Sequence, residues 1–139
     1  MVLVLVDACV LLDVITGDPT WGDWSAAQLS RCLAQGPVAI NPVIYAEVAF
    51  AYEQIELVEE VIPRHLYGYR PIPREAAFLA ARAHANYRAR GGSRHMILPD
   101  FLIGAHAVVE QSSLLTRDAR RYRQAFPGLR LITPPTANR

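Results

Sequence analysis

Val2-Leu-Val-Leu-Val-Asp7 is the stretch that decides the fold, because five apolar residues run without interruption into a carboxylate. Short apolar runs rich in β-branched residues are typical of strands buried on both faces, as in parallel sheets covered by helices. The residues from Val10 to Ile15 then predict a short helix, which Gly17-Asp18-Pro19 ends. This opening therefore predicts a buried strand, an acid at its carboxyl end and a helix.

The same alternation of elements continues along the chain. The predicted helices are residues 21–35, 42–52, 53–66, 74–90, 98–111 and 118–124, and the predicted strands are residues 38–40, 69–72, 113–116 and 130–132. Short strands that alternate with helices indicate a parallel sheet wrapped on both faces. We expect a three-layer α/β/α sandwich with a central, mostly parallel sheet. It forms one domain over residues 1–133, followed by a flexible C-terminal tail over residues 134–139.

The net charge of +1 conceals a split between the two halves of the chain. Residues 1–63 hold nine acids and a single arginine, whereas residues 64–139 hold thirteen arginines and four acids, and there is no lysine. A basic half is typical of a protein that meets a polyanion or an acidic partner. Solvated, arginine-rich helix faces produce the same pattern, so charge alone leaves both interpretations open.

The two cysteines indicate where the protein works. Cys9 and Cys32 lie in apolar surroundings and match neither a metal-binding spacing nor a disulfide framework, which favours a reducing environment. The apolar run at the start is cut short by Asp7 and is far too short to span a membrane. We therefore expect a cytoplasmic protein.

Four acids fall where ligands collect in open α/β sheets, near the carboxyl ends of the strands. Asp7 and Asp118 follow predicted strands, Asp100 opens a helix, and Glu47 lies in an apolar stretch of another helix. Each acid alone has an ordinary explanation, such as capping a helix or facing water. Together they would repel one another, and a divalent cation that prefers oxygen ligands would relieve that repulsion. Mg²⁺ or Mn²⁺ suits such a site.

At these positions the chain resembles a family, the PIN domains, and in particular the VapC toxins of bacterial VapBC toxin–antitoxin modules. The resemblance covers nearly the whole length. It rests on Val6-Asp7 with Val10-Leu11-Leu12, on Ala46-Glu47-Val48, on Pro99-Asp100-Phe101-Leu102-Ile103-Gly104-Ala105 and on Leu115-Thr116-Arg117-Asp118. It implies a metal-dependent endoribonuclease that is a homodimer and is inhibited by a cognate VapB-type antitoxin.

The resemblance also implies roles for individual residues. Asp7, Glu47, Asp100 and Asp118 would be the catalytic acids and would hold Mg²⁺ or Mn²⁺, directly or through waters. Thr116 matches a hydroxyl position that is common in the family, and its hydroxyl could bond a metal water or a ligand carboxylate.

The mechanism expected of such a site follows from the charge of the metal. A cation held by these acids would lower the pKa of a bound water, which would then attack the RNA phosphodiester. The new phosphate would stay on the downstream fragment. Arg117 and Arg120 follow or flank Asp118 and are predicted to contact the RNA backbone, because arginine forks onto phosphate oxygens.

One departure from the family pattern leaves an alternative open. The family often has Ser, Thr or Asn in the two positions after the first aspartate, where this chain has Ala8 and Cys9. A hydrogen bond to the site could therefore be missing, and a catalytically weak or inactive PIN-fold protein that binds RNA or a partner is the main alternative. Metal-dependent cleavage of DNA is a second alternative, which is closer to the predicted ribonuclease function. A phosphoacceptor receiver domain is excluded, because its chemistry needs a lysine and this chain contains none.

Overall fold

The structure is a computed structural model that describes residues 2–92 and 95–135. Ser93, Arg94 and residues 136–139 lie outside these ranges, and with them most of the predicted tail. The helices are α1 (Ala8–Thr16), α2 (Gly22–Gln35), α3 (Pro42–Ala49), α4 (Ile55–Val61), α5 (Arg74–Ala89), α6 (Leu98–Val109) and α7 (Ala119–Ala125). The strands are β1 (Val4–Val6), β2 (Val38–Ile40), β3 (Gly68–Tyr69), β4 (Ser113–Leu115) and β5 (Leu131–Ile132).

The strands form one sheet in the order β3-β2-β1-β4-β5, and every neighbouring pair is parallel. The predicted α/β sandwich with its parallel sheet is therefore confirmed. The three inner strands consist almost wholly of buried apolar residues, as their uninterrupted apolar sequences predict. β1 lies at the centre, so that the sheet is built around the stretch that opens the chain.

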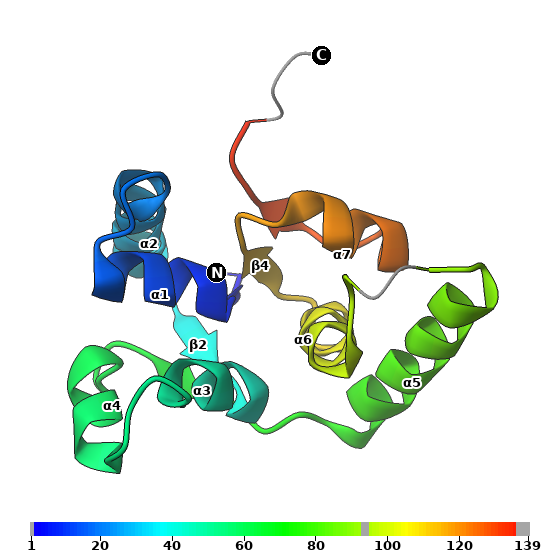
Figure 1. The fold of residues 1–139 in the computed structure, drawn as a ribbon, viewed down its shortest axis with the longest axis horizontal. Coiled ribbons are helices and arrows are strands. Elements are labelled where there is room, and N and C mark those ends of the chain that lie inside the picture. The colour runs from blue at the N-terminus through cyan, green and yellow to red at the C-terminus, as the bar shows by residue number, and fades with distance from the viewer. Residues whose placement is uncertain (1, 93–94, 136–139) are drawn as a thin grey trace.

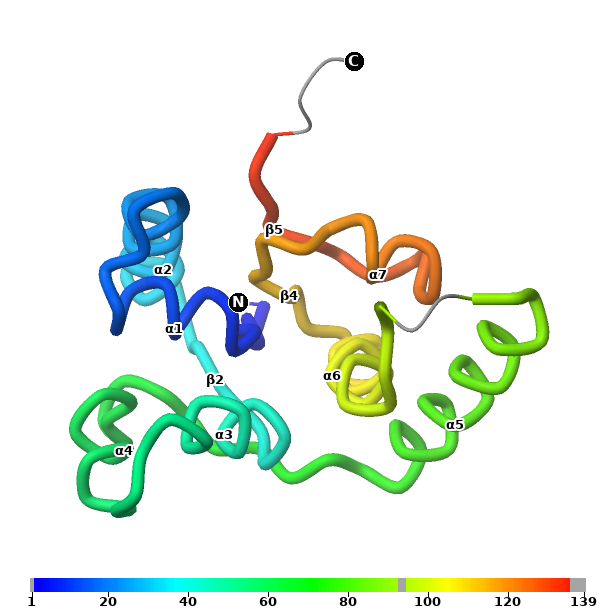
Figure 2. The backbone as a smooth tube through the Cα atoms, viewed as in Figure 1, coloured from blue at the N-terminus to red at the C-terminus, as the bar shows by residue number. Residues whose placement is uncertain are grey.

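Helices cover both faces of this sheet. Figures 1 and 2 show α1 and α2 on one side and α6 and α7 on the other, with α5 packed outside α6. Helix α3 contacts both α1 and α6. The helices that carry the predicted acids therefore meet around the carboxyl ends of β1 and β4.

The register of the sheet brings two predicted site residues together. Val6 of β1 pairs with Leu115 of β4, so that Asp7 and Thr116 both follow paired residues at the carboxyl edge. The backbone N–H of Asp7 donates to the carbonyl of Leu115 at 2.9 Å. Neighbouring parallel strands thus fix the distance between these two residues without help from a loop.

The predicted elements are all present, but one helix is much shorter than expected. The sequence predicts a helix over residues 53–66, whereas α4 ends at Val61. Pro63 explains the difference, because a proline disfavours helical backbone in the residue before it. Ile62 accordingly has φ −129° and ψ 72°. The chain then turns through residues 63–67 into β3.

Gly104 sets how closely α7 approaches α6. A Cβ atom at this position would lie 2.6 Å from Cδ2 of Phe126 and 3.2 Å from Cδ1 of Tyr122, which are both buried aromatic side chains of the α7 segment. Only a residue without a side chain allows this contact. The glycine therefore determines how closely α7 packs against α6.

Gly104→Ala should destabilise the protein by about 1–2 kcal/mol, because the cost of overpacking exceeds the gain in helix propensity. Urea denaturation followed by circular dichroism measures the change. Gly128→Ala is the matched control, since a Cβ atom there meets nothing within 4 Å, and its stability should stay close to that of the wild type. Equal urea midpoints for the two variants would contradict this, because they would show that α6 and α7 can move apart without loss of stability.

Candidate functional site

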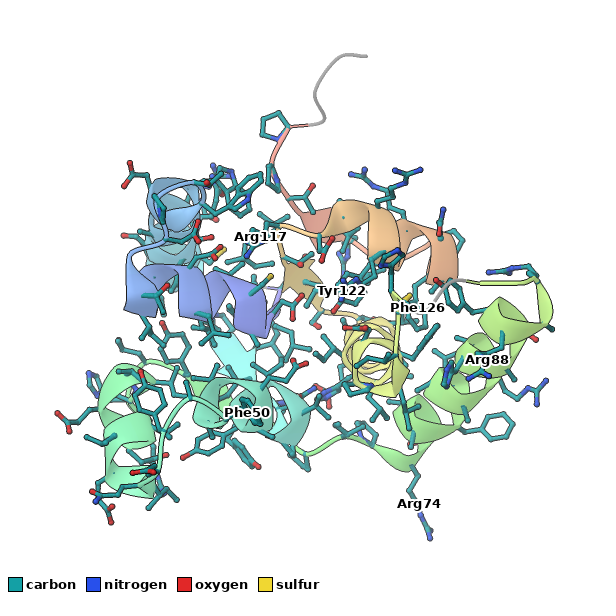
Figure 3. The ribbon with its side chains drawn as sticks, in the orientation of Figure 1. Phe50, Arg74, Arg88, Arg117, Tyr122 and Phe126 are labelled. Atoms are coloured by element: carbon teal, nitrogen blue, oxygen red, sulfur yellow. The ribbon has the colours of Figure 1, made fainter. Side chains whose placement is uncertain are left out.

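Asp7 lies at the carboxyl end of β1 and is only 7% exposed. Its Oδ1 accepts the backbone N–H of Ala8 at 2.8 Å and so caps α1. Its Oδ2 accepts the hydroxyl of Thr116 at 2.8 Å and the phenol of Tyr122 at 3.2 Å. Figure 3 shows Tyr122 directed from α7 into the interior, between α7 and α6. One carboxylate thus joins β1, α1, β4 and α7.

The protonation of these groups follows from their burial. Burial raises the pKa of Asp7, although the hydrogen bonds from Thr116, Tyr122 and Ala8 oppose this rise. Burial, together with the negative charges of Asp7 and Asp100, raises the pKa of Tyr122 well above its usual value. The phenol therefore stays protonated and can donate a hydrogen bond to Asp7.

The thiol of Cys9 contacts two groups of the site. The Sγ atom lies 3.7 Å from Oδ2 of Asp7 and 3.6 Å from Oγ1 of Thr116. Burial and the charge of Asp7 raise the pKa of the thiol to about 12, so that it stays protonated and donates to the carboxylate. At Cys9, where the sequence departs from the family pattern, the side chain therefore supplies a weak hydrogen bond to Asp7.

Asp100 is in the first turn of α6 and is 6% exposed. Its Oδ2 accepts the backbone N–H of Ile97 at 2.9 Å, which satisfies an amide at the start of the helix. Its Oδ1 accepts Nη1 of Arg121 at 3.0 Å. The charge of Asp100 raises the pKa of Asp7, so that the two carboxylates interact across the gap between β1 and α6.

Glu47 lies on α3 and is half-buried. Burial, followed by the charges of Asp7 and Asp100, raises its pKa to about 7, and the charge of Arg121 opposes this rise. Glu47, Asp7 and Asp100 therefore form one electrostatic group, although they come from three separate segments of the chain. The mutual repulsion of such a group is the feature that a bound cation would relieve.

Asp118 stands at the rim of this group. Its side chain is 46% exposed, and its Oδ2 lies 3.2 Å from Nη2 of Arg121. The backbone N–H of Asp118 donates to the Thr116 hydroxyl at 3.1 Å, which holds the start of α7 against the end of β4. The guanidinium of Arg121 thus connects Asp118 to Asp100.

The four predicted acids are gathered at one edge of the sheet, but they are not closed around one point. Within residues 2–92 and 95–135, no three His, Cys, Asp or Glu side chains come close enough to hold a single cation between them. The donor set consists of carboxylates, which suits Mg²⁺ or Mn²⁺. Burial, and after it the charges of Asp7 and Asp100, raise the pKa of Glu47, so that a further negative charge is disfavoured at this position.

The two arginines predicted to contact RNA have different surroundings. Arg117 donates to both oxygens of the buried Asp13, at 2.7 and 3.1 Å, and Asp13 also accepts the hydroxyl of Ser25 at 2.8 Å. Figure 3 shows Arg117 directed toward α1 and α2. Arg120 is exposed and lines a pocket of about 500 Å³ beside Asp118 and Arg121. Of the two, only Arg120 is exposed beside the acids, and its predicted contact with RNA stays a prediction.

A model of the PIN domain matches residues 4–127. The chain belongs to the PIN domain family. No curated protein matches it significantly. None of the described helices of this PIN domain is both long and apolar enough to cross a membrane.

Solved structures of similar fold cover the PIN domain almost end to end. The crystal structure of VapBC2 from Rickettsia felis, bound to a DNA fragment from their promoter, has a TM-score of 0.74 and 17% identity and covers 94% of this chain and 98% of that one. The structure of VapBC-1 from nontypeable Haemophilus influenzae has a TM-score of 0.73 and 13% identity, with 94% and 97% covered. A toxin–antitoxin complex from Klebsiella pneumoniae has a TM-score of 0.65 and 21% identity, with 96% and 99% covered. At identities this low, the similarity between these structures establishes a shared fold and nothing further.

The bonds that Tyr122 and Arg121 make to the acids of this PIN domain were not predicted from the sequence, which placed Arg121 only among the arginines that flank Asp118. Tyr122 bonds Asp7, and Arg121 bonds Asp100 and Asp118. A signal for each is present in the sequence. Arg121 is three residues beyond Asp118, which is the spacing of a helical ion pair. Tyr122 and Phe126 are four residues apart among arginines, which marks the inward face of a short helix.

Glu47→Gln should change how the stability of the metal-free protein depends on pH. Because the folded state raises the pKa of Glu47 from 4.5 to about 7, the folded state binds this proton more tightly than the unfolded state does. Ionisation of Glu47 therefore removes stability as the pH rises from about 4.5 to about 7, and the loss is complete above that range. The stability of E47Q relative to the wild type should increase between pH 5 and pH 8, roughly, when both are unfolded by urea in chelator.

Glu53→Gln is the control for this titration. It removes the charge of an exposed carboxylate outside the helices, so that it measures the effect of losing one surface charge. A pH-dependent difference for E47Q no larger than that for E53Q would contradict the raised pKa of Glu47.

Proposed function

We propose that this PIN domain is a metal-dependent endoribonuclease and acts as the toxin of a toxin–antitoxin pair. The observation that carries the proposal is the electrostatic group of Asp7, Glu47 and Asp100 at the carboxyl edge of the sheet, with Asp118 at its rim. Membership of the PIN domain family supports a nuclease. The likeness of the fold to VapBC complexes supports the toxin role.

Asp7, Glu47, Asp100 and Asp118 would hold the metal. When bound, Mg²⁺ or Mn²⁺ supplies a Lewis acid that activates water and neutralises charge on the phosphoryl oxygens. Thr116 and the backbone N–H of Ala8 keep the Asp7 carboxylate fixed and aimed. Such anchoring matters because a catalytic carboxylate has to stay within about 0.5 Å of its working position.

The substrate would enter beside α7. The pocket next to Asp118 is lined by Arg120, Arg121 and His95, so that positive charge lies next to the acids. A phosphate of an RNA backbone could be held there by the exposed Arg120. Arg117 stays a weaker prediction as an RNA contact, because Asp13 already accepts from its Nε and Nη2 atoms.

The protein partners follow from the same proposal. A VapB-type antitoxin would bind the toxin and block its site, and a homodimer is the expected assembly. Phe50 is 94% exposed and lines the same pocket as Glu47, so that it supplies an apolar surface for protein contacts beside the acids. A toxin that cuts cellular RNA would act in the cytoplasm.

Binding of RNA or a partner without cleavage remains the alternative. Two observations favour it. Arg121 forms ion pairs with Asp100 and Asp118. In addition, no three acids among the described residues come close enough to hold one cation. Only an assay of cleavage separates the two functions.

Purified protein, freed of any partner, should cut structured RNAs in Mg²⁺ or Mn²⁺ and stop when EDTA is added. Asp100→Asn should lower the cleavage rate by at least about a hundredfold, because it removes a charged ligand. Its amide oxygen can still accept from the N–H of Ile97, so that α6 keeps its start. Cleavage by attack of water leaves the phosphate on the downstream fragment, and end-labelling of the fragments checks this.

The folding of D100N is checked by circular dichroism. Equal cleavage by the wild type and D100N would mean that the site is assigned wrongly or that a contaminant cuts. A folded wild type that cuts nothing in broad RNA pools but retards them in gels would support the binding function instead.

A further inference from the structure

Arg121 occupies the space between two of the proposed metal ligands. Its Nη1 donates to Oδ1 of Asp100 at 3.0 Å, and its Nη2 lies 3.2 Å from Oδ2 of Asp118. Its side chain is 32% exposed, so that the guanidinium is partly withdrawn from water and weakly screened. The planar fork of arginine allows one side chain to bridge two carboxylates in this way.

The charge of Arg121 acts on most of the acidic group. Burial works to lower its pKa, but the charges of Asp100 and Asp118 outweigh burial and the pKa is raised. The same positive charge opposes the rise in the pKa of Glu47. Arg121 therefore does for Asp100, Asp118 and Glu47 what a bound cation would do, since it supplies positive charge where the carboxylates repel one another.

Arg121 and a metal ion would compete for the same oxygen atom. Oδ2 of Asp100 already accepts the backbone N–H of Ile97, which makes Oδ1 the oxygen of Asp100 that is turned toward the site. Oδ1 is also the atom that accepts from Arg121. A cation bound to Oδ1 would lie against the guanidinium, and the two positive charges would repel each other.

We propose that Arg121 is a built-in competitor of the metal, which holds Asp100 and Asp118 together in the metal-free protein and has to release them before a divalent cation can bind. The proposal rests on the proposed metal site. It makes Arg121 a residue that sets the metal concentration at which the site fills. A site without it would fill at lower metal concentration but would be less stable when empty.

Arg120 provides the matched control. It is the neighbouring residue on α7 and carries the same charge, but it is exposed and forms no ion pair within the described residues. Replacing either arginine with glutamine removes one positive charge from the same helix. Only Arg121→Gln frees the two carboxylates.

The test is isothermal titration of Mn²⁺ into partner-free, chelator-treated wild type, D100N, R121Q and R120Q at one pH. We expect R121Q to bind Mn²⁺ about tenfold more tightly than the wild type, because the competing ion pairs are gone. R120Q should stay within about twofold of the wild type, since an exposed and screened charge contributes little. Mn²⁺ should also raise the melting temperature of R121Q more than that of the wild type.

A residue with a merely structural role would weaken metal binding when lost, or leave it unchanged. Affinity of R121Q for Mn²⁺ equal to or below that of R120Q would therefore overturn the proposal. If R121Q does not fold, Arg121→Lys gives the answer, because an ammonium keeps the charge but cannot fork onto both acids. R121K should then bind Mn²⁺ more tightly than the wild type, and weaker or equal binding would contradict competition.

The wild type and D100N test the metal site separately. Binding to the wild type that is lost in D100N would support the metal site whatever Arg121 does. Binding to R121Q but not to the wild type would support both the site and the competition. Absence of binding in every variant would overturn the metal site and the role of Arg121 together.

Discussion

The Asp7 carboxylate is 7% exposed at the end of β1, where an ion without partners would cost several kcal/mol. Its partners are the first amide of α1, the hydroxyl of Thr116 and the phenol of Tyr122. These donors come from three elements, and each element has to be in place before the charge is stabilised. The burial of one acid therefore couples the centre of the sheet to α1, β4 and α7.

The packing of α7 against α6 determines which side chains reach the acids of the site. Gly104 lets Phe126 and Tyr122 approach α6, and this approach brings the phenol to Asp7 and the preceding residue, Arg121, to Asp100. A short helix of seven residues would be marginal on its own. Its buried aromatic side chains and its bonds to the acids hold it in place, so that the site stabilises the element that completes it.

The parts of this molecule that sequence could predict are those set by local pattern and by strand pairing. The apolar strands and the acid after β1 follow from short buried runs in a parallel sheet, whereas Thr116 was expected from the resemblance to PIN domains. The ion pair between Arg117 and Asp13 could not be predicted, because it joins residues 104 positions apart whose side-chain directions depend on packing. The bonds from Tyr122 to Asp7 and from Arg121 to Asp100 also join distant parts of the chain, so that the local spacing around Asp118 gave only a partial signal for them.

The end of α4 was mispredicted for a different reason. Charged and apolar residues continue at helical spacing beyond Val61, but Pro63 overrides that pattern. The acids themselves could be located from sequence, whereas the arginine between two of them could not. The identity of a site is therefore easier to predict than its electrostatic state, which depends on long side chains that can reach several partners.

The unequal charge of the two halves of the chain takes on a different meaning in the fold. The acidic first half and the basic second half meet inside the molecule, where Arg117 neutralises Asp13. Arg121 neutralises Asp100 and Asp118 within the second half itself. An arginine committed to an internal carboxylate contributes little attraction for a distant polyanion, because its field is largely cancelled nearby. The surface that an RNA would meet is therefore less basic than the sequence suggests, and exposed residues such as Arg120 have to supply most of the attraction.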